Sequence, residues 1–266
     1  MPVFTDQMQH QVEIPTSPQR IVSLVPSQTE LLFDLGLQDQ IVGVTKFCIH
    51  PKAQCASKTR IGGTKKFHFD RIDALKPDLI IGNKEENYQE GIEALAEKYP
   101  VWMSDIFTLD DALHMMQQLG EITDTTSRAQ AFIQEIKTGF ANLVVPQKGT
   151  TKVAYFIWRK PYMAAGNNNF IDEMIKRCGW QNVFADTPRY PEISPEQLAK
   201  KSPDVILLSS EPYPFKQKHL EEFQQICPQA KVLLVDGEMF SWYGSRLRLA
   251  PAYFKQLLGE LAVSSF

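Results

Sequence analysis

Short, almost uninterrupted apolar runs alternate along this chain with segments in which apolar positions recur every three or four residues. The first pattern is typical of strands buried on both faces of a parallel sheet, and the second of helices that cover such a sheet. In the first half we expect strands at residues 20–27, 40–47, 78–82 and 100–105, and helices at residues 29–37, 87–98 and 109–120. This alternation predicts an α/β lobe.

The same alternation returns in the second half, where we expect strands at residues 152–158, 204–209 and 231–236 and helices at residues 169–178, 218–226 and 248–262. Between the two series, apolar side chains in residues 124–145 follow a helical period. About 20 helical residues span roughly 30 Å. We therefore expect an N-terminal lobe at residues 1–122, one long rigid helix at 123–146 that ends in the turn at 146–150, and a C-terminal lobe at 147–266.

One segment recurs in the same register in both halves. DRIDALKPDLII, from Asp70, overlays EQLAKKSPDVIL, from Glu196, with a constant offset of 126 residues. Each copy reads as an acid, a helix, a proline–aspartate pair and a strand. An acid at a helix start also has a simple capping explanation, because the helix dipole and free N–H groups favour a carboxylate there. The equivalent placement favours two topologically alike lobes, and a symmetric pair of acids suits a symmetric partner.

Composition narrows the class of protein. With 266 residues and 43% hydrophobic content the chain can bury one large core or two medium-sized ones, and a formal charge of −3 gives no support to a nucleic-acid partner. No window holds the 18 or more apolar residues that cross a bilayer. The first residues lack a basic stretch followed by an apolar run, so we expect either a cytoplasmic protein or one whose export signal was removed.

The four cysteines are too scattered for a disulfide scaffold. Cys48 and Cys55 could close a small loop in an exported protein; otherwise all four are ordinary half-buried thiols.

Ligands of open parallel sheets bind beyond the carboxyl ends of the strands. After the first strand, Ser27 and Glu30 have the spacing of a capping box. The other loops combine aromatic rings with cations, which suits a large, partly flat ligand. In the first lobe these ligand-loop candidates are Phe47, His50, Lys65 and Phe67, and in the second Trp158, Arg159, Tyr162, Met163, Tyr190, Phe240, Trp242, Tyr243 and Arg246. Core packing is the competing interpretation of each aromatic, and the two arginines could receive an anionic iron chelate.

The sequence gives little support to a receptor for a bare metal ion or to an enzyme. The five histidines have no compact ligand spacing, and the phosphate-binding, nucleophile-elbow and zinc-protease motifs are missing. Asp105, Asp110 and Asp111 could be a catalytic group, but a helix start explains the adjacent pair. A two-lobed enzyme such as a glycosyltransferase is the less favoured alternative.

Taken together, four stretches resemble the solute-binding proteins of ABC importers for cobalamin and iron–siderophore complexes, most closely the cobalamin-binding members. They are RIVSLVPSQTELLFDLGL, RIDALKPDLII, IWRKPYMAAG and PEISPEQLAKKSPDVILL. The resemblance implies a monomeric, non-enzymatic receptor with two Rossmann-like lobes, a rigid connecting helix and a ligand cleft between the lobes. It implies that a metal chelate is delivered to an ABC permease, with cobalamin or a corrinoid favoured over a ferric siderophore or haem. Location would be periplasmic or at the membrane surface.

The resemblance also assigns roles to residues. Asp70 and Glu196 fall where the family has acids that pair with permease arginines, although the first acid is commonly Glu. Phe47, Met163 and Tyr190 align with aromatic ligand contacts, whereas Thr64 and Asn83 stand where cobalamin-binding members have tryptophan.

Overall fold

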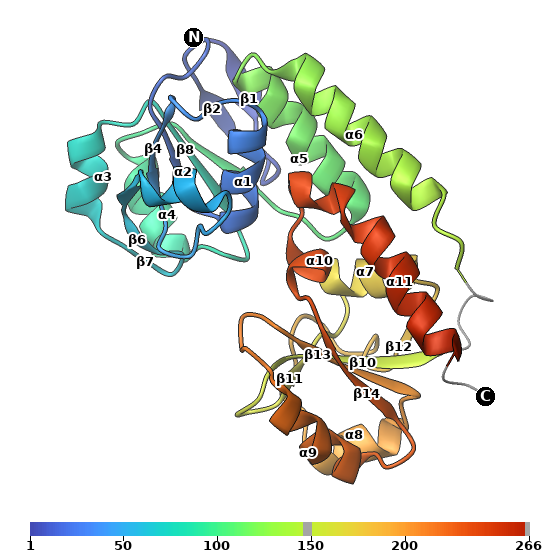
Figure 1. Ribbon diagram of the computed structural model, residues 1–266. Helices are drawn as coiled ribbons and strands as arrows, with labels where there is room; N and C mark the ends of the chain where they lie inside the picture. The colour runs from blue at the N-terminus through green and yellow to red at the C-terminus, as the bar shows by residue number, and fades with distance from the viewer. Residues whose placement is uncertain (146–150, 264–266) are drawn as a thin grey trace. The chain divides into compact units, whose positions relative to one another are not determined.

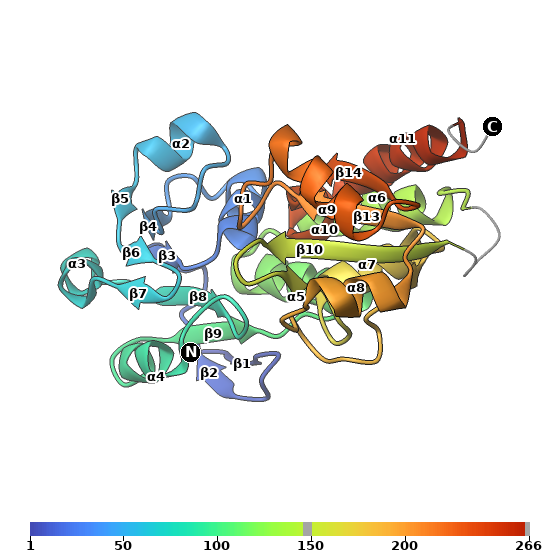
Figure 2. The ribbon, with the colours of Figure 1, turned by 90° about the horizontal axis from the view of Figure 1, so that it is seen from below.

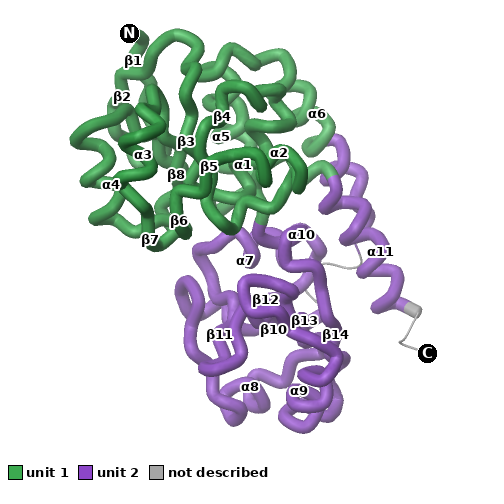
Figure 3. The backbone as a smooth tube through the Cα atoms, turned by 60° about the vertical axis from the view of Figure 1, so that its left-hand side comes forward, with its two compact units in different colours: residues 1–137, 242–248 green, residues 138–241, 249–266 purple. Residues whose placement is uncertain are grey.

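The computed structural model describes residues 1–145 and 151–263 and divides the chain into two compact units. Unit 1 comprises residues 1–137 and 242–248, and unit 2 comprises residues 138–241 and 249–266 (Figure 3). Each unit has its own central parallel sheet, so the predicted fold class of two α/β lobes is confirmed. No helix within the described ranges is long and apolar enough to cross a membrane.

Unit 1 is built on a five-stranded, all-parallel sheet. Its order is β5 (Thr59–Arg60), β4 (Ile41–Val44), β3 (Ile21–Ser23), β8 (Leu79–Asn83) and β9 (Val101–Ser104). All five residues of β8 are buried, which explains the continuous apolar run in the sequence. Its helices include α1 (Pro26–Asp34), α2 (Lys52–Ala56), α3 (Phe69–Leu75), α4 (Gln89–Ala96) and α5 (Leu109–Ile122). Two small hairpins also belong to the unit: β1 (Val3–Thr5) pairs with β2 (Gln11–Glu13), and β6 (Gly62–Gly63) pairs with β7 (Lys66–Phe67).

The sheet of unit 2 has the order β11 (Met163–Ala164), β10 (Lys152–Trp158), β13 (Val205–Ser209) and β14 (Lys231–Val235), and β12 (Gln181–Asn182) also pairs with β10. Only the short edge strand β11 is antiparallel. In Figure 1 this sheet lies between α8 (Pro195–Lys201) and α9 (Leu220–Ile226) on one side and α7 (Phe170–Arg177), α10 (Glu238–Ser241) and α11 (Ala250–Val263) on the other. The unit is therefore a three-layered α/β structure.

Successive side chains of β10 serve the two faces of this sheet. Phe156 packs its ring 4.8 Å from that of Phe223 on α9. Tyr155, one position earlier, lies 5.0 Å from Phe240 of α10, which in turn lies 4.8 Å from Phe254 of α11. Both faces of the strand are buried, as a parallel sheet covered by helices requires. Figure 2 shows β10 as a long strand with its face toward the viewer.

The internal repeat is reproduced in detail. Helices α3 and α8 both have seven residues, and both end in a left-handed residue, Lys76 and Ser202, each with a φ of 46°. The strand that follows has five residues in both units. Asp78 accepts the backbone N–H groups of Gln19 and Arg20 at 2.8 Å, and Asp204 accepts that of Lys152 at 2.7 Å. The two aspartates therefore fix the start of the neighbouring strand in the same way.

The long helix is shorter than the expected range of 123–146. Helix α6 (Thr126–Ala141) buries Ala129, Ile136 and Phe140, as its periodicity predicts, but Leu143 lies beyond its end. The predicted turn at 146–150 lies outside the described residues. The division between the units falls within α6, after Lys137.

The expected C-terminal lobe was contiguous, whereas residues 242–248 belong to unit 1. They include the 3-10 helix η2 (Ser245–Arg248), which packs on α1. Gly244 permits the close approach, because a Cβ at this position would lie 2.4 Å from the carbonyl oxygen of Ser27. Sequence order alone concealed this return of the chain.

The capping box proposed for α1 is wrong. The helix begins at Pro26, its N-cap is Val25, and no side chain caps it. Pro26 needs no partner for a missing N–H, so the helix starts without a capping side chain. Glu30 instead forms an ion pair with Arg246.

Candidate functional site

The two acids with equivalent sequence positions occupy equivalent structural positions. Asp70 lies in the first turn of α3 and Glu196 in the first turn of α8, and both are exposed. The helix dipole stabilises a negative charge at this end. Each unit therefore presents an exposed carboxylate in the first turn of a seven-residue helix.

The surroundings of the two acids differ. Ser194 caps α8 and donates a hydrogen bond of 2.7 Å from its Oγ to Glu196. This bond lowers the pKa of the Glu196 carboxyl below its ordinary value. The N-cap of α3 is His68, whose side chain does not cap the helix. Glu196 is thus held in place by a neighbouring hydroxyl, and Asp70 has the shorter side chain.

In unit 1, the loop after β4 presents apolar side chains to solvent. Phe47 is 50% exposed and Ile49 is 49% exposed. The Lys46 ammonium lies 4.9 Å from the centre of the Phe47 ring. Arg60 of β5 donates to the carbonyl oxygens of Thr45 and Cys48, at 2.7 and 2.9 Å, and these hydrogen bonds hold the loop in place. An exposed aromatic ring on a fixed loop is suited to stacking on a flat ligand.

The other two unit 1 candidates before Asp70 differ from each other. Lys65 donates from its ammonium to the carbonyl oxygens of Glu85 and Asn87, at 2.6 and 3.3 Å, and ties two loops together. Phe67 is only 5% exposed and packs against Phe69 and Tyr88. The assignment of Phe67 to the ligand set is corrected, because its aromatic neighbours enclose it in the core of unit 1.

The two positions without tryptophan belong to a buried polar network. Asn83 is 1% exposed, and its side-chain amide N–H donates to Ser104 Oγ at 3.0 Å. Its side-chain oxygen Oδ1 accepts from the backbone N–H groups of Glu85 and Glu86. Asn87 donates to the carbonyl oxygen of Thr64 at 3.1 Å. The side chains of Asn83 and Asn87 shape the loops after β6 and β8, and they offer no ring to a ligand.

Trp242, Tyr243 and Arg246 were expected in the second lobe, and this placement is wrong. All three lie in the segment that belongs to unit 1. Trp242 and Tyr243 are 6% and 7% exposed, and the Trp242 ring lies 5.5 Å from that of His50. The fold therefore brings His50, from the loop after β4, beside a ring nearly 200 positions later in the chain.

In unit 2, the end of β10 presents Trp158, which is 39% exposed and lies 5.6 Å from the ring of Tyr213. Next to it, Arg159 donates to Glu222 Oε2 from Nε and Nη2, at 2.9 and 2.7 Å. The hydroxyl of Tyr162 donates to the other oxygen of Glu222. Both oxygens of one carboxylate are thus engaged by two members of the predicted ligand set.

The remaining ligand-loop candidates of unit 2 differ in exposure: two lie at the surface and one in the core. Met163 and Tyr190 are partly exposed, and the Arg189 guanidinium lies 5.9 Å from the Tyr190 ring. Phe240 is fully buried among Tyr155, Tyr253 and Phe254. Phe240 is therefore corrected to a core residue. An aromatic side chain in a loop-forming sequence gave no signal that distinguished these outcomes.

Sequence reasoning missed Glu222 and Tyr213 as neighbours of the ligand-loop residues, and it gave Glu30 a capping role. Glu222 lies on α9, more than sixty positions after Arg159. Nothing in the local pattern of an amphipathic helix singles out one acid as the partner of a distant arginine. Only the packing of α9 against the sheet brings them together.

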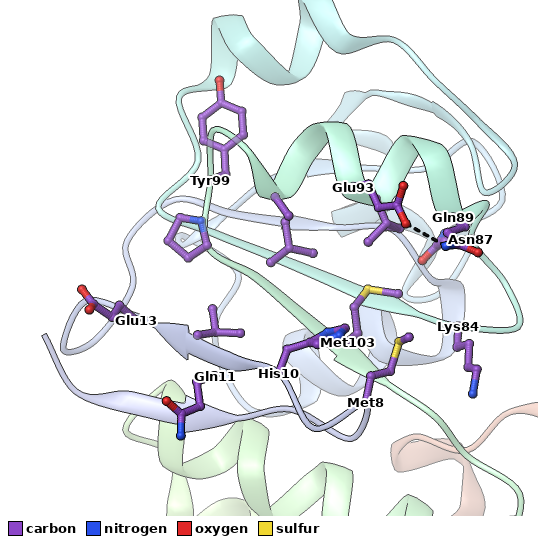
Figure 4. Close-up of a pocket in the computed structure, with 15 residues that line it drawn as sticks. Met8, His10, Gln11, Glu13, Lys84, Asn87, Gln89, Glu93, Tyr99 and Met103 are labelled. Carbon is purple, nitrogen blue, oxygen red and sulfur yellow. Dashed lines mark hydrogen bonds between the residues drawn. The ribbon is translucent and has the colours of Figure 1, made fainter.

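A separate groove of about 660 Å3 opens in unit 1 between the β1–β2 hairpin, β9 and α4. Figure 4 shows Met8 and Met103 on its floor and Glu93 and Tyr99 on the side of α4. None of the predicted ligand residues lines it. Among the residues that the structure describes, no group of three or more His, Cys, Asp or Glu side chains could hold a metal ion.

The acids considered for catalysis have structural partners. Asp111 closes a capping box with Thr108 at the start of α5, as the helix-start interpretation predicts. Asp105 forms an ion pair with Lys84 at 2.6 Å.

Each unit combines a parallel sheet, loops that carry aromatic side chains, and an exposed acid in the first turn of a seven-residue helix. Comparison with known proteins identifies the family. A family model described as "Periplasmic binding protein" matches residues 21–226, and the chain belongs to this family. Its members carry solutes and are not enzymes, so the chain is a non-enzymatic solute-binding protein.

Among curated proteins, the chain is 30% identical over 195 residues to the "Vitamin B12-binding protein" of Vibrio parahaemolyticus serotype O3:K6, covering 72% of this chain and 70% of that protein. Among solved structures, the periplasmic vitamin B12 binding protein of Vibrio cholerae matches with a TM-score of 0.75 and 22% identity, over 93% of this chain and 99% of that one. A periplasmic heme-binding protein from Roseiflexus sp. RS-1 matches with a TM-score of 0.76 and 21% identity, over 92% and 99%. At these identities the structural matches show the fold alone.

Proposed function

We propose that this protein is the substrate-binding component of an ABC importer, and that it captures a corrinoid such as cobalamin and delivers it to a membrane permease. The observation that carries the importer role is the equivalence of Asp70 and Glu196. Both are exposed, both lie in the first turn of a seven-residue helix, and both helices end in the same left-handed conformation. Two equivalent carboxylates suit a permease whose two halves present equivalent cations.

The docking contacts act on orientation more than on affinity. An exposed ion pair contributes roughly 0 to 1 kcal/mol. Complementary charges raise the rate of encounter and select one orientation of the complex. The Ser194 hydrogen bond keeps Glu196 in one position, which favours an oriented contact on unit 2.

The preference for a corrinoid is supported by the relatives and by exposed rings. Proteins named as vitamin B12-binding are 27–30% identical to this chain over most of its length. Phe47, Trp158 and Tyr190 offer partly exposed aromatic faces on ligand loops. Such faces stack on large, partly planar ligands. Export to the periplasm is part of the same proposal, because the importer collects its ligand outside the inner membrane.

The importer role is tested with the double variant Asp70→Lys and Glu196→Lys. We expect it to bind cyanocobalamin with wild-type affinity in calorimetry, with one site per chain, and to lose uptake into vesicles that contain the cognate permease. The matched control is Glu90→Lys with Glu221→Lys, since these exposed acids also lie in the first turns of helices, one in each unit. Unchanged uptake in the first variant, or equal loss in the control, contradicts docking through Asp70 and Glu196.

The ligand is tested separately with the wild-type protein. Heat on titration with cyanocobalamin supports a corrinoid receptor. No heat with cyanocobalamin, together with tight binding of haemin or a ferric siderophore, would contradict the corrinoid and leave the importer role standing.

A further inference from the structure

Arg159 stands beside the exposed aromatic ring of Trp158 at the end of β10, where a bare guanidinium would be a ready receptor for an anionic ligand. Arginine recognises carboxylates and phosphates by paired N–H donors in one plane. Here Nε and Nη2 are both used on a single oxygen of Glu222. The carboxylate therefore occupies the face of Arg159 that would recognise an anion.

Glu222 is held in this role by a second residue. Its other oxygen accepts the hydroxyl hydrogen of Tyr162, so the carboxylate has three hydrogen bonds from two side chains. The side chains of Arg159 and Glu222 are 27% and 25% exposed. Their pair is less screened than one in open solvent, and its geometry is fixed.

Aromatic rings surround the ion pair of Arg159 and Glu222. Tyr213 lies between Trp158 and Phe215, with ring centres 5.6 and 4.9 Å away. Tyr162 packs on Phe223 at 5.0 Å. This face of unit 2 is thus aromatic, with its arginine charge cancelled.

The arginine of the unit 1 ligand loops is also paired with a carboxylate. Arg246 donates from Nε and Nη2 to the two oxygens of Glu30, at 2.8 and 2.5 Å. The two side chains are 12% and 13% exposed. In each unit, considered separately, a carboxylate of that unit neutralises the arginine of the predicted ligand set.

We propose that Glu222 is a specificity residue, which cancels the charge of Arg159 so that the aromatic face of unit 2 accepts an electrically neutral ligand and discriminates against anionic chelates. Glu30 plays the corresponding part for Arg246 in unit 1. The inference rests on the proposed receptor function and adds the ligand's charge class. Core packing does not explain a carboxylate at this position of α9, whereas the hydrogen bonds of Glu222 to Arg159 do.

The test compares ligands of nearly equal shape and different charge. Cyanocobalamin is neutral, and its monocarboxylic acids, in which one peripheral propionamide is hydrolysed, carry one negative charge. We expect the wild-type protein to bind cyanocobalamin about tenfold more tightly than at least one of these acids, since a charged hydrogen bond is lost or opposed. We expect Glu222→Gln, which keeps an oxygen for Tyr162, to reduce this ratio to about twofold or less.

Two further variants make the test specific. Glu221→Gln removes the same charge from the same turn of α9 without touching Arg159, and the wild-type ratio should persist. Adding Arg159→Gln to Glu222→Gln should restore discrimination, because the unmasked cation is gone. Thermal melting confirms that each variant is folded. A ratio in Glu222→Gln equal to that of the wild type, or a change of the same size in Glu221→Gln, would overturn the proposal.

Failure of the receptor assignment gives a different result. If no corrinoid binds, haemin, a dicarboxylate, serves as the anionic probe. Tighter haemin binding by Glu222→Gln than by the wild type, reversed by Arg159→Gln, supports the specificity role although the corrinoid assignment has failed. Equal haemin binding by all the variants refutes the specificity role as well.

Discussion

Arg246 donates two hydrogen bonds to Glu30 across 216 positions of sequence, and this ion pair is almost enclosed. The guanidinium also lies 5.0 Å from the centre of the Trp242 ring. The ion pair attaches the segment of residues 242–248 to α1 of unit 1, and the ring contact lies within the segment. A contact of this kind decides to which unit a segment belongs.

We expect Glu30→Gln to lower the free energy of unfolding by about 2 to 4 kcal/mol, because the Arg246 charge remains in a poorly solvated position. Urea denaturation measures the change. Lys98→Met is the control, since it removes an ion pair with Asp73 whose side chains are 55% and 40% exposed. Its cost should stay below about 1 kcal/mol. Equal costs for the two variants would show that the burial of the Glu30 pair has no energetic consequence.

The left-handed ends of α3 and α8 predict a matched pair of stabilising substitutions. Lys76 and Ser202 adopt a φ of 46°, which is unfavourable for residues with a Cβ and free of strain for glycine. We expect Lys76→Gly and Ser202→Gly each to raise stability by roughly 0.5 kcal/mol in urea denaturation, because the relief of about 1 to 2 kcal/mol of strain exceeds the cost of about 0.5 to 1 kcal/mol for the freedom of glycine in the unfolded chain.

The control for this pair is the C-cap of α4. Glu97 has a φ of −64°, an ordinary helical value, so glycine has no strain to relieve there. We expect Glu97→Gly to lower stability by about 0.5 to 1 kcal/mol through the added freedom of the unfolded chain. A stabilising Glu97→Gly, or opposite signs at Lys76 and Ser202, would contradict the equivalence of the two helix ends.

The four cysteine thiols are expected to react slowly with alkylating reagents in the folded protein. All four are free and buried, and burial raises the pKa of the Cys55 thiol to about 11. Cys48 lies 3.1 Å from Thr29 Oγ1, and Cys55 donates to the carbonyl oxygen of His50. We expect little alkylation by iodoacetamide at pH 8 and four alkylated sites after unfolding, counted by mass spectrometry. Alkylation of Cys178 and Cys227 alone, located by peptide mapping, with an intact mass lower by two hydrogens, would instead show the Cys48–Cys55 disulfide.

Most of the fold was accessible from the sequence, because parallel sheets covered by helices leave a strong periodic signal. The repeat from Asp70 and Glu196 also carried its own geometry, since the prolines before Asp78 and Asp204 mark where each helix must end. The location of Trp242 was not accessible. The residues before it belong to unit 2, whereas the close approach at Gly244, the Arg246 ion pair and the ring contact with His50 hold residues 242–248 to unit 1.

The candidate ligand set was predicted less well than the fold. Phe67, Phe240 and Phe47 are the same residue type in similar loop sequences, yet the first two are core and the third is half exposed. Burial depends on which neighbours arrive from elsewhere in the chain, and local pattern does not contain them. The same reason hid the partners of both arginines, since Glu30 and Glu222 lie on helices remote in sequence.

The Glu222 cluster predicts a pH dependence whose sign can be worked out. Burial opposes ionisation of Glu222, but the hydrogen bonds from Tyr162 and Arg159 outweigh it and bring its pKa below the ordinary value near 4.5. A carboxyl whose pKa is lower in the folded state contributes stability that is present above its unfolded pKa and is lost as the pH falls through the folded value. We therefore expect the wild type to melt at a higher temperature than Glu222→Gln at pH 7, and the difference to shrink below about pH 4.5. His219, whose pKa is lowered by burial and by nearby Arg159, also interacts with the Glu222 charge, which raises the His219 pKa, so part of the pH dependence comes from this pair. A melting difference that stays constant from pH 7 to pH 3 would mean that the Glu222 charge contributes nothing to the stability of the folded state.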